Sequence, residues 1–391
     1  MHRRSFLFGT STLLISQLLV GCNAKQQPQL TVQVLKGSIP GRILKGFEDR
    51  VEKNLSQKVQ LKFSPVVQLR ELFKGLKSLK KNETEAVVSE GFDISRFFGK
   101  SQPKNIDLVT LGDFWLKDAI EGNLIQPLSG EKLKNWSKLS PKWQELVTRD
   151  NQGLADEKGQ IWAAPYRWGS TVIIYRRDKL DKFDWELQDW SDLWREELKG
   201  RISLLDQPRE TIGLTLKRLG KSYNTENLKE VPSLEEELQK LNKQIKFYNS
   251  ANYIEPLILG DTWIAVGWSN DIVSLLARYP QLSIIVPNSG TALWADLWVK
   301  PQSSSVETDL SSQWIDYCWE PKIAKQIALL TKANSPISTD ITKIAASDIP
   351  KPLQNILLAN TDIFNNSEFL IPLSKATAKE YDLLFMKMKV G

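Results

Sequence analysis

The sequence predicts an α/β protein of two lobes, each a mostly parallel sheet flanked by helices, with more than one crossing between the lobes. Three observations predict this class. Strand-like and helix-like segments alternate along the chain. They form two blocks, separated by a loop with Pro and Gly that leads into an extended run at Thr171–Tyr175. The 391 residues exceed one ordinary domain, and 41% hydrophobic residues can build a sizeable core.

The first block begins with "LTVQVL", Leu30–Leu35, whose alternating side chains are typical of a strand. We expect a helix at 42–55, a second strand at 58–64 and an amphipathic helix at 69–81. The apolar positions of the second helix recur at helical spacing, at Leu69, Leu72, Phe73, Leu76 and Leu79. "IDLVTLGD", Ile106–Asp113, is expected to be a buried strand followed by a turn.

The second block continues with "GRISLLDQPRETIGLTLKRLG", which predicts a strand, a loop and a helix. Ser233 and Glu236 have the spacing of a capping box for a helix over 234–248. "WIAVGW", Trp263–Trp268, predicts a buried strand, with a helix starting at Asp271. We assign residues 30–163 with 289–330 to the first lobe, and residues 164–288 with 331–391 to the second.

The N-terminal segment has the features of an export signal. A basic start with Arg3 and Arg4 precedes an apolar run too short and too interrupted for a membrane span. The run ends in "LVGC", which resembles the lipobox of bacterial lipoproteins. We expect residues 1–21 to be a signal peptide, Cys22 to carry lipid, and residues 22–29 to be a tether. The mature protein would then lie in the periplasm or at the extracytoplasmic face of the cell membrane.

Composition excludes several kinds of site. Removal of residues 1–21, which contain two arginines and no acid, lowers the formal charge from +6 to +4, and basic residues interleave with acids. Nucleic-acid binding is therefore not expected. The single histidine, His2, lies in the signal segment, so histidine-based catalysis and histidine-ligated metals are excluded from the mature chain. We expect no cofactor, no metal and a monomer.

Three loops follow predicted strands, at Gly112–Trp115, Asp206–Glu210 and Trp268–Asp271. Ligands of open α/β sheets bind beyond the carboxyl ends of the strands. Two facing lobes would therefore bring these loops to one cleft.

Five stretches in order resemble bacterial extracellular solute-binding proteins of the spermidine/putrescine type. They are "IDLVTLGDFWLKDAIEGNLIQPL", "PYRWGSTVIIYRRDKL", "LLDQPRETIGLTLKRLGKSYNT", "GWSND" and "PNSGTALWADLWVKP". The resemblance implies a type II periplasmic-binding-protein fold that closes on its ligand and delivers it to an ABC permease. Such a protein is a binding protein and not an enzyme.

Carried over by position, the resemblance implies seven ligand-binding residues: Trp268, Asp271, Glu210, Asp296, Trp294, Phe114 and, at the hinge, Trp168. These types suit a small organic cation such as a polyamine. Carboxylates form charge-assisted hydrogen bonds with ammonium groups, and indole faces attract cations. Each residue also has a plain structural role open to it, as a core aromatic or a charge in the first turn of a helix.

The sequence departs from the family pattern in several places. The first ligand loop has Lys36 and Ile39 where the family usually has aromatic residues, Gln207 stands where an acid is common, and Arg167 lies close to the hinge. Two alternatives follow: the same clamp for another polar or zwitterionic solute, or an envelope lipoprotein with a degenerate cleft. An envelope enzyme using Glu210 and Asp296 as paired carboxylates is a third alternative.

Overall fold

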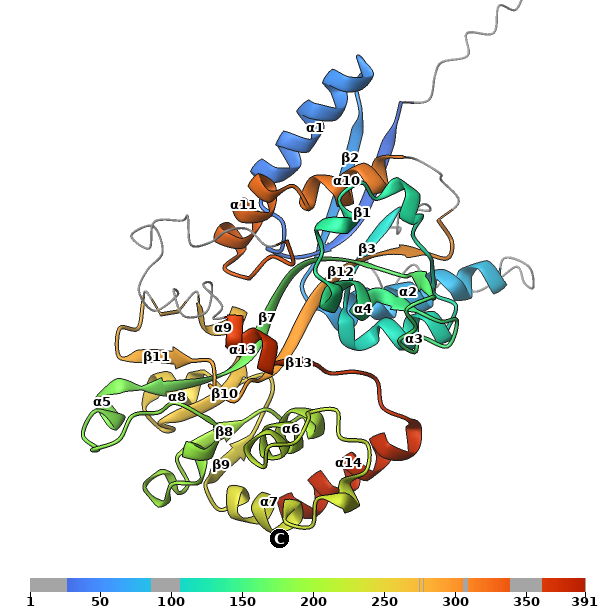
Figure 1. The fold of residues 1–391 in the computed structure, drawn as a ribbon. Helices are drawn as coiled ribbons and strands as arrows, with labels where there is room; N and C mark the ends of the chain where they lie inside the picture. Colours follow the sequence, from blue (N-terminus) through green and yellow to red (C-terminus); the bar gives the residue numbers. More distant parts are fainter. Residues whose placement is uncertain are drawn as a thin grey trace, which may run out of the picture.

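The computed structural model describes residues 27–85, 106–273, 275–276, 278–304, 309–337 and 361–390. An eleven-stranded sheet runs through the molecule, with the main order β2-β1-β3-β12-β7-β10-β8-β9 (Figure 1). β1, β2 and β3 are parallel to one another at one end, and β10, β8 and β9 at the other. The α/β class is confirmed. The predicted signal peptide and the predicted lipid-attachment residue Cys22 lie outside the described residues.

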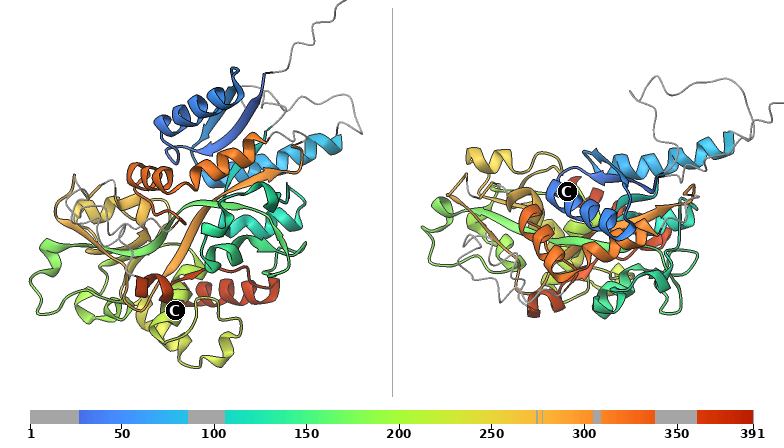
Figure 2. Two further views of the ribbon diagram at one scale, coloured as in Figure 1. Left: turned by 45° about the horizontal axis from the view of Figure 1, so that its top comes forward. Right: turned by 90° about the horizontal axis from the view of Figure 1, so that it is seen from above.

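The first part of the sheet is doubly wound. It consists of β1 (Gln29–Leu35), β2 (Gln60–Val66) and β3 (Leu108–Gly112), with β1 in the middle. α1 (Gly41–Leu55) and α2 (Leu69–Glu85) lie on opposite faces of these strands (Figure 2). Right-handed crossovers, the general rule for parallel strands, produce this arrangement when the first strand lies in the middle. Both helices bury one apolar stripe, which confirms the amphipathic pattern predicted for the second of them.

Other elements complete the first core. They are η2 (Asp113–Trp115), α3 (Leu116–Glu121), β4 (Ile125–Gln126), α4 (Pro141–Val147), α10 (Leu310–Cys318) and α11 (Pro321–Thr331). Trp298 and Trp314 are fully buried there, with ring centroids 5.9 Å apart.

The second part repeats the arrangement. β8 (Ile202–Leu204) lies between β9 (Ile245–Tyr248) and β10 (Ile264–Trp268), and β11 (Leu282–Ile285) pairs with β7. The helices are α5 (Arg177–Leu180), α6 (Pro208–Arg218), α7 (Leu234–Asn242), α8 (Glu255–Leu259), α9 (Ser269–Val273) and α14 (Lys375–Val390).

Two long strands join the parts. β7 (Ala164–Arg176) pairs with β12 (Ala292–Pro301) through Ala164–Ser170 and with β10 through Thr171–Tyr175. β12 in turn pairs with β3. The hydrophobic cores change near the same places. Trp168 and Leu293 belong to the first core, whereas Val172 and Ala292 belong to two separate clusters of the second part. Both strands therefore cross from one core to the other (Figure 1).

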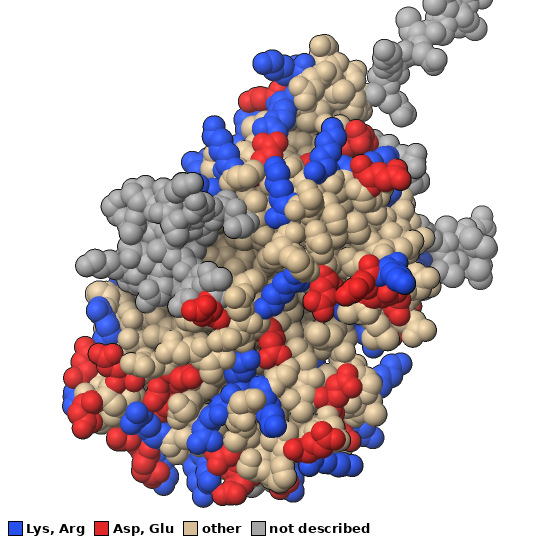
Figure 3. Space-filling view, in the orientation of Figure 1, with Lys and Arg blue, Asp and Glu red and all other residues tan. Residues whose placement is uncertain are grey.

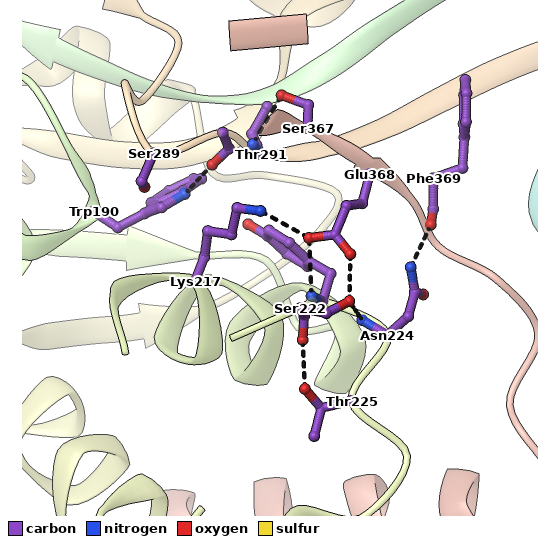
Figure 4. A network of polar contacts seen from close by, with 12 residues as sticks. Trp190, Lys217, Ser222, Asn224, Thr225, Ser289, Thr291, Ser367, Glu368 and Phe369 are labelled. Carbon is purple, nitrogen blue, oxygen red and sulfur yellow. Dashed lines mark hydrogen bonds and ion pairs between the residues drawn. The ribbon is translucent and has the colours of Figure 1, made fainter. Parts of the chain in front are cut away.

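A third connection is the segment containing α13 (Thr361–Asn366) and β13 (Glu368–Phe369). Lys142 of α4 donates to the carbonyl oxygens of Phe364 at 2.9 Å and Ser367 at 2.5 Å, which ties the segment to the first part. Glu368 forms an ion pair with Lys217 of α6 at 2.7 Å and accepts a hydrogen bond from Ser222 (Figure 4). The segment thus contacts both parts. The exact lobe limits given above remain a prediction.

One expectation about the second block was wrong. The helix predicted for 234–248 ends at Asn242, and Ile245–Tyr248 forms strand β9. Parallel pairing of β9 with β8 overrides the helical spacing of the apolar residues. The capping box is also absent, because Ser233 has φ −77° and ψ −7° and its side chain makes no cap hydrogen bond. An N-cap side chain needs an extended backbone to reach the first turn.

Candidate functional site

The predicted loops converge where β7 and β12 cross between the cores. Asp296 of β12 is paired in register with Gly112 of β3 on one side and Arg167 of β7 on the other. Thr171 and Ser170 of β7 contact Glu210 and Ser269 of the second part. We divide this region into a hinge end (Arg167, Trp294 and Asp296) and a helix end (Glu210, Trp268 and Asp271).

At the hinge end, a buried arginine pairs with a buried aspartate. Nε of Arg167 donates to Oδ2 of Asp296 at 2.5 Å, and the side chains are 7% and 1% exposed. Burial raises the pKa of Asp296, and Arg167 opposes that shift. The Arg167 guanidinium also lies 5.9 Å from the centre of the Trp294 ring, within the range of a cation–π contact. The Asp296 carboxylate therefore already holds a cation supplied by the protein.

Strand alternation explains which aromatic residues face the site. Trp294 pairs with Gly169, and Asp296 pairs with Arg167, so these four residues lie on one face of the β7–β12 ladder. A Cβ atom at Gly169 would come within 2.2 Å of the Trp294 ring and 2.5 Å of Ser269 Oγ. Glycine at this position therefore permits the close approach of the two ends.

The predicted residue Trp168 lies on the other face of that ladder. It is 7% exposed, packs against Trp143 and Phe364, and donates its indole N–H to the Ser335 carbonyl at 2.9 Å. These contacts give Trp168 a packing role in the hinge, because its ring and its only donor are both in use.

The loop after β3 contributes an acid that sequence reasoning missed. Oδ1 of Asp113 accepts the Ala295 N–H at 3.0 Å. The pKa of Asp113 is raised to about 7, mainly by burial of the carboxyl group and also by the nearby Asp296, while the hydrogen bond from the Ala295 N–H lowers it. The predicted neighbour Phe114 is instead 56% exposed and lies edge-on to Trp115. Of this loop, Asp113 rather than Phe114 reaches the hinge end.

At the helix end, Glu210 is held in the first turn of α6, after Pro208. It is 7% exposed, and its Oε1 accepts the Thr171 hydroxyl at 2.9 Å. No hydrogen bond of normal geometry reaches its buried Oε2 from the part of the chain that the structure describes. Burial raises the pKa of Glu210 to about 7, whereas Thr171 and the indole of Trp268 favour the ionised form. Glu210 is thus a buried acid with acceptor capacity to spare.

Trp268 and Asp271, the other predicted residues of this end, are held by Tyr253. The Tyr253 hydroxyl donates to Oδ2 of Asp271 at 2.7 Å and accepts the backbone N–H of Trp268 at 3.1 Å. Asn270 donates to Oδ1 of Asp271 at 2.8 Å. Burial raises the pKa of Asp271, while both hydrogen bonds and Arg167 lower it. A Cβ atom at position 267 would lie 1.9 Å from the Tyr253 ring, so only glycine fits before Trp268.

Comparison with known proteins identifies the family. A family model described as bacterial extracellular solute-binding protein matches residues 104–355. The chain belongs to this family. The Escherichia coli spermidine/putrescine-binding periplasmic protein is 25% identical over 285 residues, covering 73% of this chain and 78% of that protein. A Pseudomonas aeruginosa putrescine/cadaverine-binding protein is 30% identical over 210 residues, covering 50% of this chain and 56% of its own.

Solved structures of solute-binding proteins share the fold. The spermidine/putrescine ABC transporter substrate-binding protein PotD of Streptococcus pneumoniae has a TM-score of 0.73 at 20% identity, covering 93% of this chain and 99% of its own. The Treponema pallidum lipoprotein Tp0655 has a TM-score of 0.66 at 15% identity, covering 93% and 100%. The predicted two-lobe, type II periplasmic-binding-protein fold is confirmed.

Other features of this solute-binding protein concern its surface and its acids. Lys and Arg side chains interleave with Asp and Glu over the face shown in Figure 3. Among the described residues, no cluster of three or more His, Cys, Asp or Glu could hold a metal ion. Within the same residues, no helix is both long and apolar enough to cross a membrane. Lys36 is exposed, and Ile39 packs partly against the first core.

Proposed function

We propose that this protein is the substrate-binding lipoprotein of an ABC importer and captures a small organic cation, of the polyamine class, between its two lobes. The relatives of this chain support an organic cation as the ligand, since they are named spermidine/putrescine-binding and putrescine/cadaverine-binding proteins. The lobes would close on the ligand, and the closed protein would deliver it to the permease subunits.

The environment of Glu210 is the observation that best supports an organic cation as the ligand. A buried carboxylate whose second oxygen accepts no hydrogen bond of normal geometry from the described residues is costly, because burial removes its hydration. An ammonium group would satisfy that oxygen with a charge-assisted hydrogen bond. Trp268 lies beside the same carboxyl group and would offer its ring to the cation or to methylene groups of the ligand. One acid and one aromatic thus complement the two chemical parts of an alkylammonium ion.

The cellular setting belongs to the same proposal. Cys22 would carry the lipid after removal of residues 1–21, and residues 22–29 would tether the lobes to the extracytoplasmic face of the membrane. The crossing strands β7 and β12 would serve as the hinge between residues 30–163 with 289–330 and residues 164–288 with 331–391. Metabolic labelling with a fatty acid should mark the full-length protein and not the Cys22→Ser variant.

A binding measurement tests the ligand class. The chain from residue 22, with Cys22→Ser, is titrated calorimetrically with putrescine, cadaverine and spermidine, with glycine and glucose for comparison. We expect a diamine to bind and to raise the melting temperature, because a ligand of the folded form stabilises it. Absence of binding by all three amines at millimolar concentration would reject the proposed ligand class.

A matched pair of variants assigns the binding to Glu210. Glu210→Gln keeps the side-chain shape and removes the charge, so we expect affinity to fall by about tenfold to a hundredfold, from the worth of one charge-assisted hydrogen bond. Glu255 also stands in the first turn of a short helix, but it is exposed. Glu255→Gln should therefore bind as tightly as the parent protein.

A further inference from the structure

The hinge end already contains a cation, and this changes which ligands fit the site proposed above. Arg167 pairs with the Asp296 carboxylate at 2.5 Å and lies 5.9 Å from the centre of the Trp294 ring. An acid and an indole two residues apart on one strand face are the groups that would receive a ligand ammonium. Here, the side chain of Arg167 takes the place of that ammonium.

Replacement of Arg167 by a ligand would be unfavourable in this position. Its side chain is 7% exposed and that of Asp296 is 1% exposed, so separating them would leave two buried charges unpaired. A ligand ammonium that entered without displacing Arg167 would lie beside a like charge in a poorly solvated region. Both routes penalise a ligand that extends a cation into the hinge end.

The acids around Arg167 also disfavour its use as an anion site. Asp296 contacts it directly, Asp113 lies close to Asp296, and Asp271 is near enough to interact with Arg167. A ligand carboxylate approaching the guanidinium would meet this group of acids. Arg167 therefore balances local negative charge, and the acceptor capacity that remains lies at Glu210.

We propose that Arg167 is a built-in cation that fills the hinge end, so that the site discriminates by the number of ammonium groups and takes a diamine in preference to a triamine. This inference rests on the proposed capture of an organic cation. The hinge end would exclude the third ammonium of spermidine, whereas putrescine would need only the helix end and the region towards solvent.

Calorimetric titration with putrescine, spermidine and 4-aminobutanoate tests this selection at pH 7.5. We expect the parent protein to bind putrescine about tenfold or more tightly than spermidine, which is the scale of one unsatisfied charged group. In Arg167→Gln, which frees Asp296 for a ligand ammonium, spermidine should become the tighter ligand by about tenfold. Arg176→Gln is the matched control, because Arg176 is on the same strand and is ion-paired with Asp178 away from the site.

Arg167→Gln leaves Asp296 unpaired and could reduce folding, so a double variant is needed. Arg167→Gln with Asp296→Asn removes both charges, and its circular dichroism should match that of the parent. This variant has neither the Arg167 charge that repels an ammonium group nor a free Asp296 carboxylate that attracts one. It should therefore bind putrescine and spermidine with similar affinity.

Three results would overturn the inference. One is an unchanged ratio of putrescine to spermidine affinity in both the single and the double variant. Another is a parent protein that binds spermidine more tightly than putrescine. The third is tighter binding of 4-aminobutanoate than of putrescine, which would make Arg167 a carboxylate ligand. Failure of every variant to bind any amine rejects the proposed function as well, whereas amine binding with an unchanged ratio rejects only the role of Arg167.

Discussion

The hinge end and the helix end have the same chemical components, one or more acids beside a tryptophan, yet they are satisfied differently. At the hinge end, Asp296 is neutralised by Arg167 of the neighbouring strand. At the helix end, Oε2 of Glu210 accepts no hydrogen bond of normal geometry from the described part of the chain, and the pKa of Glu210 is raised to about 7. An acid next to an indole is therefore not by itself a cation site, because the protein can fill it with its own cation.

The largest expected effect on stability follows from removing one partner of the buried ion pair at the hinge end. Asp296→Ala should lower the free energy of unfolding by about 3–5 kcal/mol, because it leaves the Arg167 guanidinium buried without its partner. Urea denaturation of the ligand-free protein measures this change. Asp261→Ala removes an exposed partner of Lys246 and should change the stability little. Equal effects of the two variants would show that the buried pair has no special role.

Part of the pH dependence of stability should come from Glu210, in the same pH window as the buried Asp113 of the hinge end, because burial raises the pKa of both groups to about 7. The folded state keeps the Glu210 proton up to pH about 7, whereas the unfolded chain releases it near the ordinary glutamate value of 4.5. The folded state thus binds more protons between these pH values, so stability falls as pH rises through that window, by on the order of 3 kcal/mol for this group. Urea denaturation at several pH values should show a smaller decline in Glu210→Gln. An identical decline in Glu210→Gln and Glu255→Gln would argue against Glu210 as the source.

A smaller effect should follow from the group that positions the helix end. Tyr253→Phe removes the hydrogen bond to Asp271 and the acceptor for the Trp268 N–H. We expect a loss of about 1–3 kcal/mol in the free energy of unfolding, since a buried acceptor loses its donor. Tyr248→Phe, which removes the bond from that hydroxyl to Asn242, is the control in the same part of the molecule and should cost less, because Tyr248 is only partly buried. A Tyr253→Phe protein as stable as the parent would contradict this role.

Local patterns were sufficient to predict the fold class, and they also drew attention to the loops of the helix end, whose ligand-binding role stays a prediction. Alternation and helical spacing indicated the first strands and helices, and the loop after a buried strand indicated Trp268 and Asp271. Propensity alone could not show that Ile245–Tyr248 joins a sheet, because that depends on the neighbouring strand β8.

The hinge end depends on information that the sequence does not display. Arg167 and Asp296 are separated by 129 positions, and only the register of β7 against β12 makes them neighbours. The same register turns Trp168 away from the site and Trp294 towards it. Asp113 was missed for a similar reason, since its partner Ala295 lies on β12. The sequence placed Arg167 close to the hinge but could not supply its partner.

Proton release on ligand binding tests most directly whether the helix end receives the cation. Putrescine is titrated into the parent protein and Glu210→Gln at pH 7, in buffers of different ionisation enthalpy. Because the pKa of Glu210 is about 7, the free protein is about half protonated there, and an ammonium requires the ionised form. We predict release of about half a proton per ligand by the parent protein and clearly less by Glu210→Gln. Binding without proton release, or equal release by both proteins, would contradict the assignment of the cation to Glu210.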